Sequence, residues 1–76
     1  MNGFPSERTV QRIKALYRSG TRVKLVRMDD PYTKLAAGTY GTVTCVDDIG
    51  TVHVRWDNGM SLGVVYGEDE IEKVWG

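Results

Sequence analysis

The residues from Gly59 to Gly63 match the Gly-x-Ser-x-Gly pattern that surrounds the nucleophilic serine of many hydrolases. His53 and Asp57 lie nearby in the sequence, so all three residue types of an acyl-transfer triad are present. That chemistry needs the serine on a sharp turn between a strand and a helix, with the acid and the histidine later in the chain. Here both precede Ser61, and the pattern leads from a predicted hairpin into a predicted strand. We therefore interpret Ser61 as a strand residue and predict no catalytic residues and no enzyme activity.

Residues that could bind a metal ion are few. The chain has one histidine, His53, and one cysteine, Cys45, which do not suffice for a structural zinc site within one chain. The pairs Asp29-Asp30 and Asp47-Asp48 lack the alternate spacing of a calcium loop, and aspartate in turns commonly accepts from nearby backbone N–H groups. We predict no metal and no cofactor. His53 is expected to face solvent or a neighbouring side chain, and Cys45 to be a buried or half-buried strand residue.

Positive charge is concentrated in the first part of the chain. Residues 1–34 hold eight basic and three acidic side chains, residues 35–76 hold two and seven, and the formal net charge is zero. A basic surface of this kind could contact the phosphates of a nucleic acid. The candidates for that role are Arg8, Arg12, Arg18 and Arg22. Alternatively, outward Arg22 and Lys24 pair across neighbouring strands with Glu70 and Glu72, and we favour this internal explanation because net charge governs non-specific binding.

Aromatic side chains are the other candidates for binding. A groove lined by aromatic residues can take a polyproline-type peptide, and a nearby carboxylate can attract a basic residue of the same ligand. The predicted peptide-binding face consists of Tyr32, Tyr40, Tyr66, Asp29 and Asp30. Trp56 is instead expected in the core, because it ends a strand whose alternate residues are apolar.

The elements that position these residues are one helix and five short strands. Ser6 is the predicted N-cap of a helix over residues 7–18, which Ser19-Gly20 ends. Its apolar stripe consists of Val10, Ile13, Leu16 and Tyr17. Strands are predicted from residue 21 to the Asp29-Asp30-Pro31 segment, and then at 42–46, 51–56, 60–65 and 70–75. The Asn58-Gly59 pair predicts a tight hairpin with positive φ angles.

Five short antiparallel strands are too few for a two-sheet sandwich but can close into a small bent barrel. The long loop after the first strand and the tight turns that follow predict a mainly β, five-stranded SH3-like barrel with an N-terminal amphipathic α-helix. We divide the chain into a helical extension, residues 1–19, and a barrel domain, residues 20–76. The expected core is Val23, Leu25, Leu35, Val43, Val46, Val52, Val54, Trp56, Leu62, Val64 and Ile71.

The spacing of several residues from position 20 onward is distinctive. It includes Gly20-Thr21-Arg22-Val23, Asp29-Asp30-Pro31-Tyr32, Gly38-x-x-Gly41-x-Val43 and Val52-x-Val54-x-Trp56-Asp57-x-Gly59. Over residues 20 to about 74 the chain resembles a domain-of-unknown-function family of short bacterial proteins, often carried by phages and mobile elements. The resemblance implies an SH3-like barrel and supplies no catalytic residues.

The sequence thus favours a non-catalytic binding or adaptor module whose partner is a protein or peptide that the sequence does not identify. Nucleic-acid binding through the basic helix and first strand is the alternative. A third possibility is a self-assembling subunit that dimerises through the helix, whose stripe must cover one end of the barrel or meet another chain. The lone cysteine, the lack of an apolar run of about 20 residues and the absence of a signal-peptide pattern predict a cytoplasmic protein that does not enter membranes.

Overall fold

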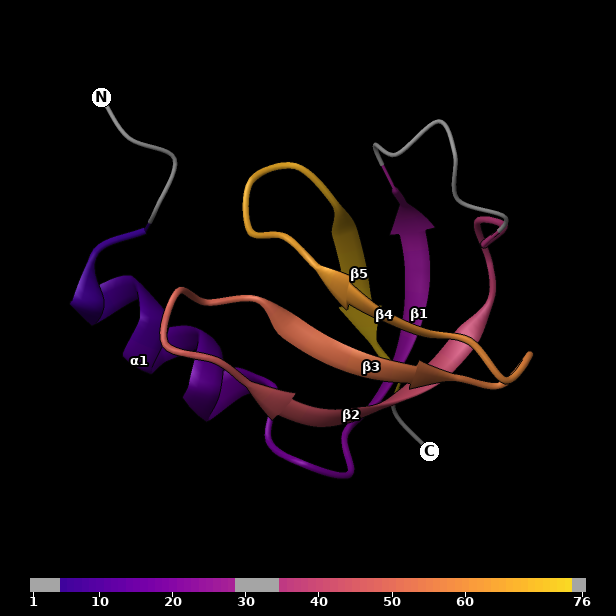
Figure 1. The fold of residues 1–76 in the computed structure, drawn as a ribbon, viewed down its shortest axis with the longest axis horizontal. Helices are drawn as coiled ribbons and strands as arrows, with labels where there is room; N and C mark the ends of the chain where they lie inside the picture. Colours follow the sequence, from indigo (N-terminus) through magenta and orange to yellow (C-terminus); the bar gives the residue numbers. More distant parts are fainter. Residues whose placement is uncertain (1–4, 29–34, 75–76) are drawn as a thin grey trace.

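The computed structural model of the protein describes residues 5–28 and 35–74. The helix α1 (Glu7–Leu16) precedes five strands, which are β1 (Arg22–Arg27), β2 (Tyr40–Val46), β3 (Val52–Trp56), β4 (Ser61–Val64) and β5 (Glu70–Lys73). Neighbouring strands pair antiparallel in the order β4-β3-β2-β1-β5 (Figure 1). The protein is therefore mainly β, with one N-terminal helix.

The sheet bends sharply along β2. The first half of β2 pairs with β1, whereas the strand pairs with β3 over most of its length, so that β1 and β5 run across the direction of β3 and β4 (Figure 1). The register of β2 against β3 shifts between Val43 and Cys45, which marks a bulge, and bulges bend strands. Thr44 and Cys45 are both exposed as a result, so the prediction of a buried or half-buried Cys45 is wrong.

The five strands form one open sheet. β4 and β5 are its two edges, and within residues 5–28 and 35–74 no ladder joins them. Each edge strand is only four residues long, and the residues between them form a turn in which the N–H groups of Glu68 and Asp69 donate to the carbonyl oxygen of Val65. The predicted closure into a barrel is therefore not made by strand pairing.

The hairpin between β3 and β4 is confirmed, but of the Asn58-Gly59 pair only Gly59 takes a positive φ. The N–H of Trp56 donates to the carbonyl of Met60 at 2.8 Å, which leaves the three residues Asp57 to Gly59 in the loop. Gly59 has a φ of 93°, whereas no described residue other than glycine has a positive φ. Asn58 instead contributes its side-chain oxygen, which accepts from the N–H of Met60 at 3.0 Å. This geometry is that of a three-residue hairpin loop with a glycine at its last position.

The core matches the prediction from alternation. The buried hydrophobic residues are Val10, Ile13, Val23, Leu25, Leu35, Val43, Val52, Val54, Trp56 and Val64. The remaining predicted core residues, Val46, Leu62 and Ile71, are partly buried against them. Trp56 is only 1% exposed, and its indole Nε1–H donates to the carbonyl of Leu62 at 3.2 Å, which satisfies the one polar atom that this side chain brings into the core.

The helix α1 begins where the sequence predicts and ends two residues early. The Ser6 hydroxyl accepts from the N–H of Thr9 at 3.2 Å, as expected of an N-cap. Tyr17 leaves the helical conformation at φ −119° and ψ 67°, because the chain must turn there so that Gly20 can donate to Val43 of β2 at 2.8 Å. No helix in the described part of the chain is long and apolar enough to cross a membrane.

Candidate functional site

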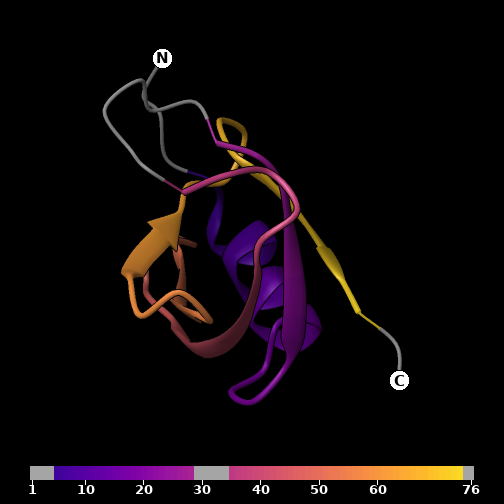
Figure 2. The same ribbon diagram turned by 90° about the vertical axis from the view of Figure 1, so that its right-hand side faces the viewer.

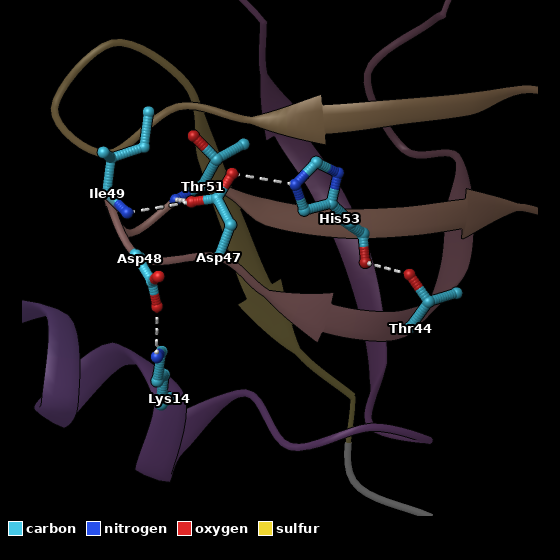
Figure 3. Close-up of polar contacts among 7 residues, drawn as sticks. All are labelled: Lys14, Thr44, Asp47, Asp48, Ile49, Thr51 and His53. Atoms are coloured by element: carbon cyan, nitrogen blue, oxygen red, sulfur yellow. Dashed lines mark hydrogen bonds and ion pairs between the residues drawn. The ribbon is translucent and has the colours of Figure 1, made fainter.

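The helix docks on its own sheet, at the turn between β2 and β3. Figures 1 and 2 place α1 across one end of the curved sheet. Gly50 of the turn lies so close to the helix that an added Cβ would meet Ile13 Cδ1 at 3.3 Å and Val10 Cγ2 at 3.5 Å. The Lys14 ammonium also lies 3.1 Å from the Asp48 carboxylate (Figure 3). Of the two alternatives left open by the sequence, Val10 and Ile13 therefore follow the first, in which the stripe covers one end of the sheet.

Asp47 fixes the shape of this turn (Figure 3). Its Oδ1 accepts from the backbone N–H of Thr51 at 2.9 Å and of Ile49 at 3.1 Å, and its Oδ2 accepts from His53 Nε2 at 3.0 Å. Burial acts to raise the pKa of the carboxyl, but these three hydrogen bonds outweigh it and hold the pKa below its ordinary value of 3.8. The prediction that Asp47 accepts from its own turn is confirmed, and His53 faces a neighbouring side chain as expected.

The three hydrolase-like residues do not form a triad. His53 and Ser61 line one small pocket, but Asp57 is bonded to Arg22 rather than to His53, whose Nε2 is bonded to Asp47. Ser61 lies in β4 opposite Arg55, as the strand interpretation predicts. Among the residues that the structure describes, no group of three metal-ligating side chains lies together.

A groove runs between α1 and the loop that joins β4 to β5. It has a volume of about 320 Å³, and we call it the α1 groove. Its lining residues are Thr9, Arg12, Ile13, Leu16, Tyr17, Gly50, Val52, Val64, Tyr66, Gly67, Asp69, Glu70 and Ile71. Buried Ile13, Val52 and Val64 form an apolar floor, and burial raises the pKa of the Tyr17 hydroxyl. Leu16 on one wall and Tyr66 on the other remain 47% and 54% exposed.

Of the predicted peptide-binding residues, the structure describes Tyr40 and Tyr66, and these two lie apart. Tyr66 lies in the α1 groove, near the end of β3 at which Val52 pairs with Val64. Tyr40 lies at the opposite end of β3, where its carbonyl accepts from the N–H of Asp57 at 2.9 Å. Both tyrosines are exposed, at 54% and 44%. The other three predicted residues, Asp29, Asp30 and Tyr32, lie outside the described residues.

Of the predicted nucleic-acid contacts, Arg22 is engaged within the chain. Its guanidinium donates to both carboxylate oxygens of Asp57 at 2.8 Å and lies 6.0 Å from the centre of the Tyr40 ring. The hydrogen bonds from Arg22 hold the pKa of Asp57 below its ordinary value of 3.8. The predicted pairing of Arg22 with Glu70 or Glu72 is therefore wrong, because Arg22 stands opposite Thr42 and points to the hairpin end of β3.

The remaining charged residues partly support the prediction that basic and acidic side chains pair with each other within the chain. Lys24 stands opposite Glu72 in the β1–β5 ladder, and their side chains form an ion pair at 3.3 Å, as predicted. Arg8, Arg12 and Arg18 are exposed on α1 and just after it, and Arg12 lines the α1 groove. Of the four predicted basic contacts, these three remain accessible to a ligand.

Two features of the site were missed from the sequence. One is the close approach of Gly50 to the helix, although an Asp-x-x-Gly turn after a strand signals a glycine at positive φ. The other is the α1 groove itself, which depends on where the helix docks. No sequence signal marked it, because Leu16 continues the same apolar stripe as Val10 and Ile13 and yet is 47% exposed in the structure.

A fold of this kind, with an open antiparallel sheet, a capping helix and a shallow groove, defines a small β-rich domain. The chain belongs to the family described as domain of unknown function DUF4314, whose family model matches residues 6–74. The match includes both α1 and the sheet, and it confirms the resemblance to an uncharacterised family. No curated protein matches the chain.

Proposed function

We propose that this protein is a non-catalytic, cytoplasmic binding module that docks a segment of a protein partner in the α1 groove. The observation that carries the proposal is the exposure of Leu16 and Tyr66, at 47% and 54%, on opposite walls above a buried apolar floor. Large apolar side chains that flank a concave surface favour protein contacts, and tyrosine is a common anchor of such contacts.

The architecture supports this use of the groove. β1 lies between β2 and β5, and the strongly bent sheet has a long β1–β2 connection, which supports an SH3-like relationship for the fold. The groove lies between two chain segments far apart in sequence, α1 and residues 65–71, and strand residues of the sheet form its floor. A partner segment seated there would bury Leu16 and Tyr66 without unfolding either wall.

The proposal is tested by comparing three immobilised variants with the natural chain. Proteins retained from a lysate of the source organism are identified and then titrated as purified proteins against each variant. Leu16→Glu and Tyr66→Ala are expected to weaken binding at least about tenfold, because they remove exposed anchors from the two walls. Tyr40→Ala is the matched control, since it removes an exposed tyrosine at the opposite end of β3.

A loss of binding with Tyr40→Ala and none with Tyr66→Ala would contradict the proposal. It would move the site to the end of the sheet that holds Tyr40. All three substituted side chains are exposed and contribute little to the core, so the variants are expected to fold. Circular dichroism of each variant checks that a loss of binding is not caused by unfolding.

Nucleic-acid binding is the second candidate, and the exposure of Arg8, Arg12 and Arg18 favours it. A titration against labelled duplex DNA, single-stranded DNA and RNA at low and high salt distinguishes the two functions. Binding that weakens steeply with salt and is lost with Arg8→Glu supports nucleic acid. No binding at low salt removes this candidate.

A further inference from the structure

We propose that the segment which occupies the α1 groove is α1 of a second copy of this chain, so that two copies dock helix into groove around a two-fold axis. This inference rests on the proposed function of the groove as a protein-docking surface. It goes further by naming the partner, and it is argued from the charges on the two walls of the groove.

The walls of the α1 groove bear opposite charges. Arg12 stands on the helix wall, Glu70 stands on the wall formed by the start of β5, and both are exposed. Among the ion pairs of the described residues, none includes Arg12 or Glu70. Arg27 stands opposite Glu70 on the neighbouring strand β1, but no ion pair joins these two described side chains, and Glu70 lines the groove whereas Arg27 does not.

A surface with opposite charges on either side of an apolar centre is complementary to itself. In a two-fold dimer, a contact between one pair of residues is always made twice, with the roles of the two copies exchanged. When α1 of one copy enters the groove of the other, Arg12 of each copy lies beside Glu70 of the second copy. Opposite charges facing each other across the contact favour this arrangement, whereas a flipped orientation would oppose like charges.

The apolar residues fit the same arrangement. Val10 and Ile13 are 3% and 6% exposed because they pack on their own sheet, whereas Leu16 on the same helix is 47% exposed. Figure 1 shows α1 at the edge of the molecule, with only one side against the strands. Docking this exposed part of α1 into a second groove would cover Leu16 and, reciprocally, Tyr66. This would remove two large exposed apolar side chains of each copy from water.

Charge exchange tests the proposal. The molar mass of the natural chain, Arg12→Glu, Glu70→Arg and the double variant is measured by sedimentation equilibrium over a wide concentration range at low salt. Each single variant would oppose like charges twice in the dimer and is expected to raise the dimer dissociation constant about tenfold or more. The double variant exchanges the two charges and is expected to restore dimerisation, as is an equimolar mixture of the single variants. Arg18→Glu changes the net charge by the same amount at a residue that does not line the groove, and it is therefore the control.

A natural chain that stays monomeric up to millimolar concentration overturns the proposal. A dimer that the single variants leave intact, or that the double variant fails to restore, overturns it equally. These results are separable from the fate of the proposed function. If the chain is monomeric but Tyr66→Ala abolishes its binding to a purified partner protein, the groove remains a docking site. Only the second copy is then rejected as its occupant.

Discussion

Replacing Gly50 with alanine tests whether the helix rests on the β2–β3 turn. Gly50 has a φ of +84°, and a Cβ there would lie 3.1 Å from Pro5 Cγ and 3.3 Å from Ile13 Cδ1. Two penalties follow from this geometry. A left-handed backbone costs an alanine about 1–2 kcal/mol, and forcing a methyl group into a filled contact costs about 1–3 kcal/mol more. Gly50→Ala should therefore lower the free energy of unfolding by about 2–5 kcal/mol.

Gly67→Ala is the matched control for the backbone penalty. Gly67 has the same φ of +84°, but nothing lies within 4 Å of the position of its Cβ. This variant should lose only the backbone contribution of about 1–2 kcal/mol. Urea denaturation followed by circular dichroism gives both losses, provided that the slope m is the same in the two variants. Equal losses for the two variants would refute the docking of α1 against Gly50.

Two further predictions concern the sheet and the turn. Gly41→Ala should destabilise the fold by about 3 kcal/mol or more. The added Cβ would lie 2.6 Å from Val54 Cγ1 and 2.7 Å from Trp56 Cε3. A thermal unfolding midpoint within a few degrees of that of the natural chain would contradict this packing. The carboxyl of Asp47 should titrate below 3.8 in an NMR pH series, because hydrogen bonds from His53 and the turn favour its charged form. The resulting stability is present above pH 3.8 and is lost as the pH falls through the lowered pKa, so Asp47→Asn should flatten this acid dependence. An unchanged acid dependence would contradict that role.

The sequence predicted the local elements well because each has a local cause. Ser6 caps α1 because a hydroxyl at that position can accept from the first helical turn. Alternation of apolar residues predicted the burial of Val52, Val54 and Trp56 along β3. The Asn58-Gly59 pair predicted the hairpin, although only the glycine takes the positive φ.

The candidate site was less predictable because it depends on curvature and on long-range packing. Period-two spacing tells which face of a strand is buried, but not that β2 bends at a bulge and exposes Cys45. Tyr40 and Tyr66 both lie near the end of a strand in the sequence. The pairing of the strands nevertheless places them at opposite ends of β3. The pairing of Arg22 with Asp57 joins residues 35 positions apart, and no local pattern encodes it.

The most direct test of the α1 groove as a docking site is a map of amide chemical shifts in the ¹⁵N-labelled chain as an identified unlabelled partner, or the concentrated unlabelled chain itself, is added. We expect the largest changes in residues 9–17 and 64–71, which form the two walls of the groove. Changes confined to the vicinity of Tyr40 and Asp57, at the other end of β3, would contradict the site.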